Sequence, residues 1–306
     1  MKKLLLAIIV VTGLAIPVHA YITQRRLLND AIVQTRWLSF PVTWRLVPTQ
    51  GARITGTRTQ AQVAQTSFNT WEAITTATID FTRGADTEAT TTFGFDEVNV
   101  LKTNLTTQAY ANSGAGGALA ITLISAASLT GQILDADIIF DPDFSFSTNS
   151  GTIGATDYDF EGILTHEIGH LLGLDHSAIL SATMYPRLGL GNISARVLAP
   201  DDIAGVSSIY PSSSYLTRGS LSGTVRLTSN ATVYGAVVVA VNSSGQPAGH
   251  GVTDNRGNYV INGLPAGTYQ VFAEPMDSPY NFSDQGVLET IYRSSAISTG
   301  FTTRFR

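Results

Sequence analysis

The chain has 306 residues, a formal net charge of −5 and no cysteine. A length of this order favours two domains, and the lack of cysteine excludes disulfides, thiolate metal ligands and a catalytic thiol. Only 13% of the residues are charged, and they form no basic patch, so we expect no nucleic-acid partner.

Residues 1–20 have the pattern of a secretory signal peptide. Lys2 and Lys3 precede an apolar run of 13 residues at 4–16, and small residues follow at a plausible cleavage site. The run is shorter than the roughly 20 residues that a membrane-spanning helix needs, which favours a cleaved signal over an uncleaved anchor. We therefore predict an exported protein, extracellular or periplasmic, with no membrane span once the signal is removed.

The region from residue 21 to residue 211 has the pattern of an α+β unit. Residues 21–36 form a polar lead-in that is too short to fold alone. Apolar periodicity then predicts both strands and helices. In chain order these are a strand at 40–48, a helix at 59–75, strands at 77–81 and 98–101, a strand within 114–130 after a glycine-rich loop, a strand at 133–140, a helix with Thr156 or Asp157 as its N-cap, and a last helix that begins at Pro200 and ends by Tyr210.

The sequence changes character after a linker at residues 212–218. Over residues 219–306, short stretches of alternating apolar and polar residues are separated by turn residues, a pattern typical of a small all-β sandwich. The last stretch, FTTRFR, has no turn after it, so the domain could be incomplete. His250 is the one histidine of this region, and we expect it to be a surface residue.

One run, HEIGHLLGLDH, carries the chemistry that the sequence predicts. His166 and His170 are one helical turn apart, so both rings can reach one ion. Glu167 lies beside that face, where its carboxylate can reach a metal-bound water without ligating the metal. Gly173 can adopt the positive φ of a sharp turn, which would bring His176 back as a third ligand. Three protein ligands and an open fourth position are typical of catalytic zinc.

The alternative interpretation is an amphipathic helix whose histidines are core residues. The helix does have an apolar stripe at helical spacing, which we expect to be buried: Phe160, Ile163, Leu164, Ile168, Leu171 and Leu172. For a single histidine this interpretation would be preferred. A glycine and a third histidine in register favour the metal site.

HEIGHLLGLDH followed by SATMYP resembles the matrixins, a group of metzincin zinc peptidases. FPVTWRLVP, FNTWEAITTATIDF, LDADIIFDPD, YDFEGILTHEIGH and LAPDDIAGVSSIYP resemble successive elements of the same family, in the correct order over about residues 37–211. The resemblance implies an α+β metzincin catalytic domain with a twisted mixed sheet and three helices. GSLSGTV, AVVVAVN and TDNRGNYVINGLPAGTYQV resemble the carboxypeptidase regulatory-like, transthyretin-like β-sandwiches.

The resemblance also implies roles for individual residues. Glu167 would be the general base, and Met184 would lie in the methionine turn beneath the metal. Asp202 would tie the last helix to that turn, although capping of the helix by Asp201 or Asp202 is an equal alternative. The zinc ligands would be His166, His170 and His176. The residues expected to contact an extended polypeptide substrate are Leu119, Ala120, Tyr185 and Pro186.

A second metal is a separate question. Ile121 and Asp137 stand where animal matrixins carry histidines for a structural zinc, so we expect only the catalytic zinc. Asp137, Asp141 and Asp143 could instead bind Ca²⁺ through carboxylate oxygens. A solvated acidic loop is the alternative.

The motif and the resemblance together predict a secreted zinc metalloendopeptidase. It would hydrolyse peptide bonds through a zinc-bound water activated by Glu167. The alternative is a non-catalytic extracellular surface-binding protein with a structural zinc. Such a zinc takes four protein ligands, and the sequence near the motif offers no fourth nitrogen or sulfur ligand. We expect a monomer whose partner is its polypeptide substrate.

Overall fold

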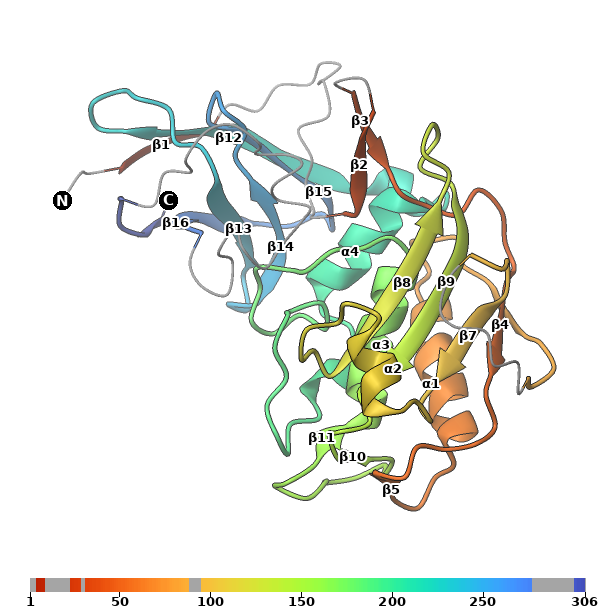
Figure 1. Cartoon of the computed structure of the whole chain (residues 1–306). Helices are drawn as coiled ribbons and strands as arrows, with labels where there is room; N and C mark the ends of the chain where they lie inside the picture. The colour runs from red at the N-terminus through yellow and green to blue at the C-terminus, as the bar shows by residue number, and fades with distance from the viewer. Residues whose placement is uncertain (1–3, 9–22, 29–30, 88–94, 277–299, 306) are drawn as a thin grey trace.

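The computed structural model describes residues 4–8, 23–28, 31–87, 95–276 and 300–305, and it has two lobes (Figure 1). The larger lobe combines a sheet with helices, whereas the smaller lobe consists of strands. Most of the expected signal peptide lies outside the described residues. Its residues Leu4–Ile8 form β1, which pairs antiparallel with β12 (Gly219–Leu227). No helix in the described ranges is long and apolar enough for a membrane crossing.

A five-stranded mixed sheet forms the centre of the larger lobe. Its strand order is β6-β4-β7-β9-β8, in which β8 runs antiparallel to β9 and the other neighbours are parallel. The strands are β4 (Val42–Leu46), β6 (Phe81–Arg83), β7 (Asn99–Lys102), β8 (Ala120–Ala126) and β9 (Ile133–Phe140). Because β8 is an edge strand, it presents backbone groups that a further strand could pair with.

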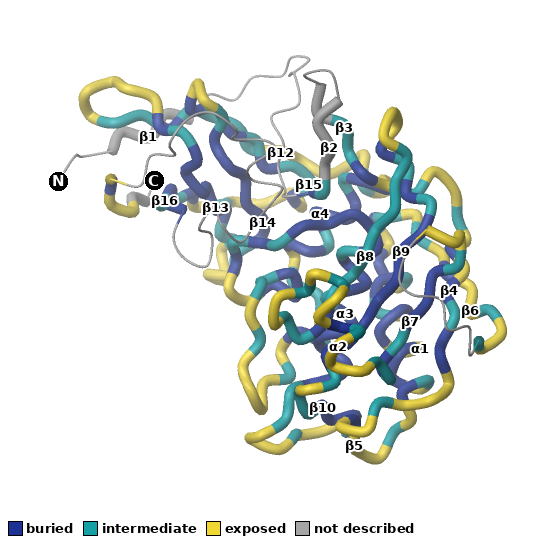
Figure 2. The backbone as a smooth tube through the Cα atoms, in the orientation of Figure 1, coloured by how far each residue is buried: buried dark blue, intermediate teal, exposed yellow. Residues whose placement is uncertain are grey.

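Two long helices build the core under this sheet. Helices α1 (Gln60–Glu72) and α3 (Phe160–Leu171) pack against each other, and α3 also contacts β8 and β9. The Trp71 indole on α1 is fully buried and donates its Nε1 proton to the carbonyl oxygen of Thr165, at 2.8 Å. Figure 2 shows that β9 is buried over most of its length. The ligand-bearing helix therefore rests on a rigid, close-packed base.

The larger lobe holds several elements that the sequence did not predict. Helix α2 (Thr107–Ala111) adds a fourth helix to the three expected. Short strands form a separate parallel sheet: β5 (Ile54–Thr55), β10 (Phe146–Ser147) and β11 (Tyr158–Asp159). The strand expected at 77–81 is displaced, since β6 begins only at Phe81 and Ala77 instead bridges Pro211.

The motif helix begins later than the sequence predicted. Its N-cap is Asp159, whose Oδ2 accepts a hydrogen bond from the backbone N–H of Gly162 at 2.9 Å. The expectation of Thr156 or Asp157 was wrong because the backbone is still extended at β11, which pairs with β10. The cap is therefore the last residue of a strand.

The lead-in at 21–36 contains a hairpin of β2 (Arg25–Leu28) and β3 (Ala31–Gln34). At its base, Gln24 donates its backbone N–H to the carbonyl oxygen of Gly173 at 2.8 Å and accepts from the N–H of Thr35 at the same distance. The segment thus lies against the turn that follows α3.

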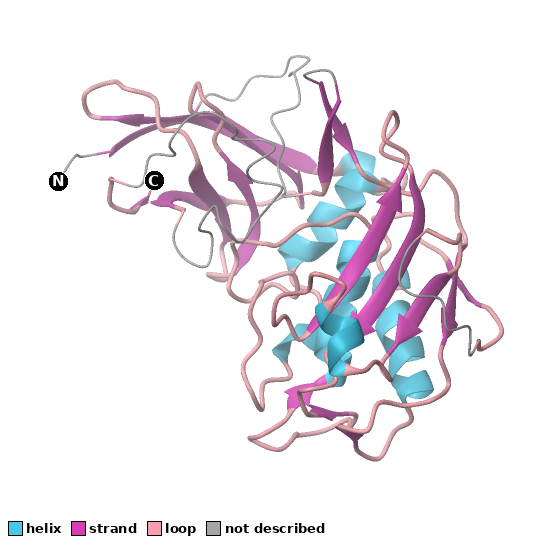
Figure 3. Cartoon of the chain, in the orientation of Figure 1, coloured by secondary structure: helices cyan, strands magenta, loops and turns pink. Residues whose placement is uncertain are grey.

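The smaller lobe contains two sheets, ordered β1-β12-β15 and β14-β13-β16-β17. Figure 3 shows that the regular elements of this lobe are strands. Besides β1 and β12 they are β13 (Ala236–Asn242), β14 (Pro247–Val252), β15 (Asn258–Leu264), β16 (Tyr269–Pro275) and β17 (Arg304–Phe305). Apolar residues from both sheets share one buried cluster, among them Val225, Val238, Ile261 and Ala273. This arrangement is the one expected of a β-sandwich.

The two lobes meet at α4 (Pro200–Ile209), which packs against β14 and β15. Before α4 lies a short 3₁₀ turn, η1 (Ser194–Arg196), and after it another, η2 (Tyr215–Thr217), within the predicted linker. A second apolar cluster joins the lobes, combining Ile179 and Ala182 with Val237, Val239 and Val252. The lobes therefore share an interface that includes an apolar cluster.

The expectation that His250 is a surface residue was wrong. His250 lies on β14 and is only 1% exposed. Its Nδ1 lies 2.9 Å from Oδ1 of Asp201, and its backbone N–H donates to the same oxygen at 3.0 Å. A lone histidine in a strand gives no sign in sequence that another domain will cover it.

Candidate metal centre

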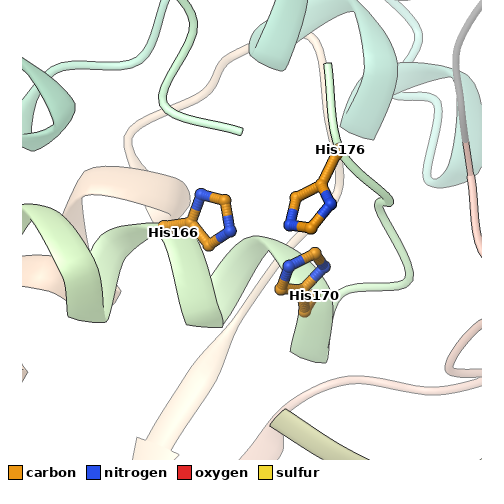
Figure 4. Close-up of side chains that lie close together, drawn as sticks. All are labelled: His166, His170 and His176. Carbon is orange, nitrogen blue, oxygen red and sulfur yellow. The ribbon is translucent and has the colours of Figure 1, made fainter. Parts of the chain in front are cut away.

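Helix α3 and the turn after it bring the three predicted ligands together (Figure 4). The ring centroids are 4.7 Å apart for His166 and His170, 4.8 Å for His170 and His176, and 5.2 Å for His166 and His176. One ligand atom of each ring lies within 4.8 Å of the others. Among the described residues, these three form the one group of three or more that could hold a metal ion.

The turn depends on Gly173, as the sequence predicted. Gly173 has a φ of 90°, a value that side chains disfavour and glycine tolerates. A Cβ atom there would lie 2.3 Å from the carbonyl oxygen of Thr35. No other residue fits this position without moving the lead-in or the turn that carries His176.

Two of the imidazoles are oriented by backbone carbonyl groups. Nδ1 of His166 lies 2.7 Å from the oxygen of Thr183, and Nδ1 of His170 lies 2.9 Å from the oxygen of Leu174. A carbonyl oxygen only accepts, so Nδ1 carries the proton in both rings and Nε2 keeps its lone pair when the ring is neutral. Burial, with the nearby His170 and His176, holds the pKa of His166 well below its usual value. Imidazole nitrogens are donors that suit zinc, so the residues present fit the ion.

Glu167 lies beside the ligands, 4% exposed. Its Oε2 accepts a hydrogen bond from the hydroxyl of Thr122 on β8, at 2.7 Å. Burial raises the pKa of Glu167, while His170 and the Thr122 hydrogen bond act in the opposite direction. A buried carboxylate with a raised pKa is a stronger proton acceptor than a solvated one.

Met184 lies under α3 and is 1% exposed. It fits there because Gly169, between two of the histidines, has no side chain: a Cβ atom on Gly169 would lie 2.2 Å from Sδ of Met184 and 2.9 Å from Trp71. The packing role of Gly169 was not predicted from the sequence. A glycine inside a helix lowers helix stability by about 1 kcal/mol relative to alanine. A glycine within the predicted helix was therefore the sequence feature that could have indicated close packing at this position.

Asp202 has both roles that the sequence left as alternatives: it contacts the methionine turn and it caps α4. Its carboxylate accepts from the backbone N–H groups of Thr183 at 2.8 Å and Met184 at 3.0 Å, and also from that of Ala199 at 2.8 Å. Burial raises the pKa of Asp202 to about 7, the charge of Asp201 adds to this, and the three N–H groups oppose it. Asp202 thus holds the methionine turn and caps α4 at once.

A cleft of about 890 Å³ runs past the three histidines and Glu167. All four residues expected to contact a substrate line it, namely Leu119, Ala120, Tyr185 and Pro186. It is also lined by Gln24 of the lead-in and by Leu180, which is 78% exposed. Neither residue could be predicted from the sequence, because only the fold brings residues 24 and 180 to the cleft.

The structure does not bring the candidate calcium ligands together. Asp137 accepts from the backbone N–H of Val100 at 3.0 Å, and Asp141 from that of Asp143 at 2.9 Å. The Asp143 carboxylate accepts from the Thr107 hydroxyl at 2.6 Å. The three carboxylates form no common ligand group among the described residues, so the geometry gives a calcium site no support.

Three histidines that could hold one metal ion, a glutamate beside them and a methionine packed below lie together in an α+β domain. Residues 36–211 match the Matrixin family, and residues 220–277 match the carboxypeptidase regulatory-like domain. The chain belongs to the matrixin family. The resemblance drawn from the motifs is thereby confirmed for both domains.

Individual relatives are similar over shorter segments. Metalloendoproteinase 1-MMP of Arabidopsis thaliana is 52% identical over 52 residues, which are 17% of this chain and 14% of the relative. Metalloendoproteinase 1 of Glycine max is 47% identical over 53 residues, 17% of each. Matrilysin of Homo sapiens is 38% identical over 80 residues, 26% of this chain and 28% of the relative. The matched segments thus span less than a third of each of these relatives.

Proposed function

We propose that the chain is a secreted zinc endopeptidase that hydrolyses peptide bonds in extended polypeptides and acts as a monomer. The single observation that carries this is Glu167, a buried carboxylate that lies beside three candidate zinc ligands and in the lining of an 890 Å³ cleft. A structural zinc site has no use for such a carboxylate. Membership of the matrixin family supports the same activity.

His166, His170 and His176 would hold the zinc. Zinc, when bound, supplies a Lewis acid that polarises a carbonyl group and lowers the pKa of water. Glu167 would take the proton from the attacking water and pass it to the leaving amine. Its raised pKa favours the first half of that transfer, the uptake of the proton from water.

The substrate would lie along β8. An extended polypeptide can add to an edge strand through backbone hydrogen bonds, and β8 is the edge of the sheet next to the cleft. Tyr185 and Pro186 line the same cleft from the segment that follows the third histidine. There they would contact a side chain of the substrate. Pairing along the strand fixes the direction of the polypeptide, and the pocket selects its side chain.

The test is cleavage of an unstructured protein such as casein by the full chain and by Glu167→Gln, with zinc content measured for both. We expect one zinc per chain in each, and a loss of turnover of about 10²- to 10⁴-fold in the variant, the usual contribution of a general base. Asp80→Asn, which changes an exposed carboxylate in the same domain, serves as the matched control and should cleave like the wild type. If both proteins hold zinc and the wild type does not cleave, the non-catalytic binding protein becomes the better account.

A further inference from the structure

Thr122 stands between the strand that borders the cleft and the candidate base. It lies in the middle of β8, opposite Ile138 of β9. Side chains alternate between the faces of a strand, so Thr122 lies on the same face as Ala120, which is buried. On that face its hydroxyl meets Glu167 of α3, 45 residues further along the chain.

The hydroxyl of Thr122 contacts two atoms of the same residue. Its Oγ1 lies 2.7 Å from Oε2 of Glu167 and 2.9 Å from the Glu167 backbone oxygen. Both are acceptors, so the single hydroxyl proton is shared between them or alternates. Thr122 thereby ties the carboxylate to the backbone of its own helix, which restricts rotation of the Glu167 side chain.

This contact is the main polar restraint on the carboxylate. In the part of the chain that the structure describes, Thr122 is the one side chain that donates a hydrogen bond to Glu167. Because Glu167 is only 4% exposed, little bulk water is available to replace the bond. With Oε2 held by Thr122, Oε1 is the carboxylate oxygen that this hydrogen bond leaves free to take a proton.

We propose that Thr122 is a positioning residue that fixes the Glu167 carboxylate in the orientation needed for proton transfer. This role rests on the proposed peptidase function. It acts through Glu167 and not through the substrate, so it raises kcat and leaves KM nearly unchanged. It also links binding to chemistry, since the backbone of β8 would pair with the polypeptide while a side chain of β8 holds the base.

The test compares Thr122→Val and Thr122→Ser with the wild type in the full, zinc-loaded chain. Valine keeps the shape of threonine and removes the hydroxyl, so we expect kcat to fall about tenfold or more, the kinetic equivalent of one hydrogen bond to a charged group. KM and zinc content should stay within about twofold, a range too small to signal lost uniform binding. Serine restores the hydroxyl and should return kcat to within about threefold of the wild type, less than the effect of one such bond.

Ser125→Ala is the matched control, because it removes a hydroxyl from the same strand at an odd spacing and hence from the opposite face. It should leave kcat unchanged. If the wild type cleaves and Thr122→Val is equally fast, or if serine fails to rescue, the positioning role is wrong and the peptidase function stands. If the zinc-loaded wild type does not cleave at all, the peptidase function fails and this role fails with it.

Discussion

The two lobes use their histidines in different ways. In the larger lobe, His166 and His170 donate from Nδ1 to backbone carbonyls, and the three imidazoles face one another (Figure 4). In the sandwich, His250 directs Nδ1 to the carboxylate of Asp201 across the lobe interface. The two kinds of histidine therefore differ in both burial and partner: the candidate ligands are half-buried, and two of them meet backbone carbonyls, whereas His250 is 1% exposed and meets a carboxylate.

The first turn of α4 serves both regions. Asp202 accepts from the backbone of the methionine turn under the metal centre. Its neighbour Asp201 accepts from the hydroxyl of Ser177 at 2.5 Å and from His250. Ser177 directly follows His176. The buried carboxylate of Asp201 therefore connects the sandwich to the backbone segment that follows this third candidate ligand.

The largest effect on this comparison is expected from His250→Ala. The change removes a buried hydrogen bond to a carboxylate that is itself 2% exposed, and we expect the free energy of unfolding to fall by about 3 kcal/mol. Denaturant unfolding of the full chain measures it. Zinc content should not change, because His250 belongs to the interface and not to the ligand group.

Ser243→Ala, an exposed position in the turn before β14, is the control for His250→Ala and should shift stability by less than about 0.5 kcal/mol. A comparably small shift for His250→Ala would contradict a structural role for this histidine. Loss of zinc in a still-folded His250→Ala protein would contradict the separation between the two kinds of histidine.

A smaller effect is expected from Gly169→Ala inside the ligand helix. The new methyl group would meet Met184 and Trp71, an overpacking that typically costs 1–3 kcal/mol, while better helix propensity returns up to about 1 kcal/mol. We expect a net loss of about 2 kcal/mol or less in unfolding free energy. Gly151→Ala, where nothing lies within 4 Å of the added atom, should be neutral. If the two variants are equally stable, the packing of Met184 does not require a glycine at position 169.

The sequence predicted best those features that depend on local spacing. The three histidines, Glu167 and the Gly173 turn follow from helix geometry within 11 consecutive residues, and the structure places them together. The strands of the main sheet and helices α1, α3 and α4 also follow from apolar periodicity, with small shifts in their bounds.

Contacts between distant segments could not be predicted in this way. The hydrogen bonds from Thr122 to Glu167 and from His250 to Asp201 span 45 and 49 residues. Neither side chain differs from an ordinary strand residue in its local pattern. The calcium site suggested at 137–143 has no support in the structure for a different reason. The spacing of its three aspartates in sequence suggested a common ligand set, which the geometry of the strand and the following loop does not produce.

In the proposed function, the three histidines bind a catalytic zinc ion and leave one coordination position open. The most direct measurement is a crystal structure of the zinc-loaded chain with anomalous scattering recorded at the zinc edge. We expect one zinc bound by His166, His170 and His176. No fourth protein ligand should be present and Glu167 should lie outside the coordination shell, since a catalytic zinc keeps one position open. A zinc with four protein ligands, or one bound elsewhere in the chain, would contradict this expectation.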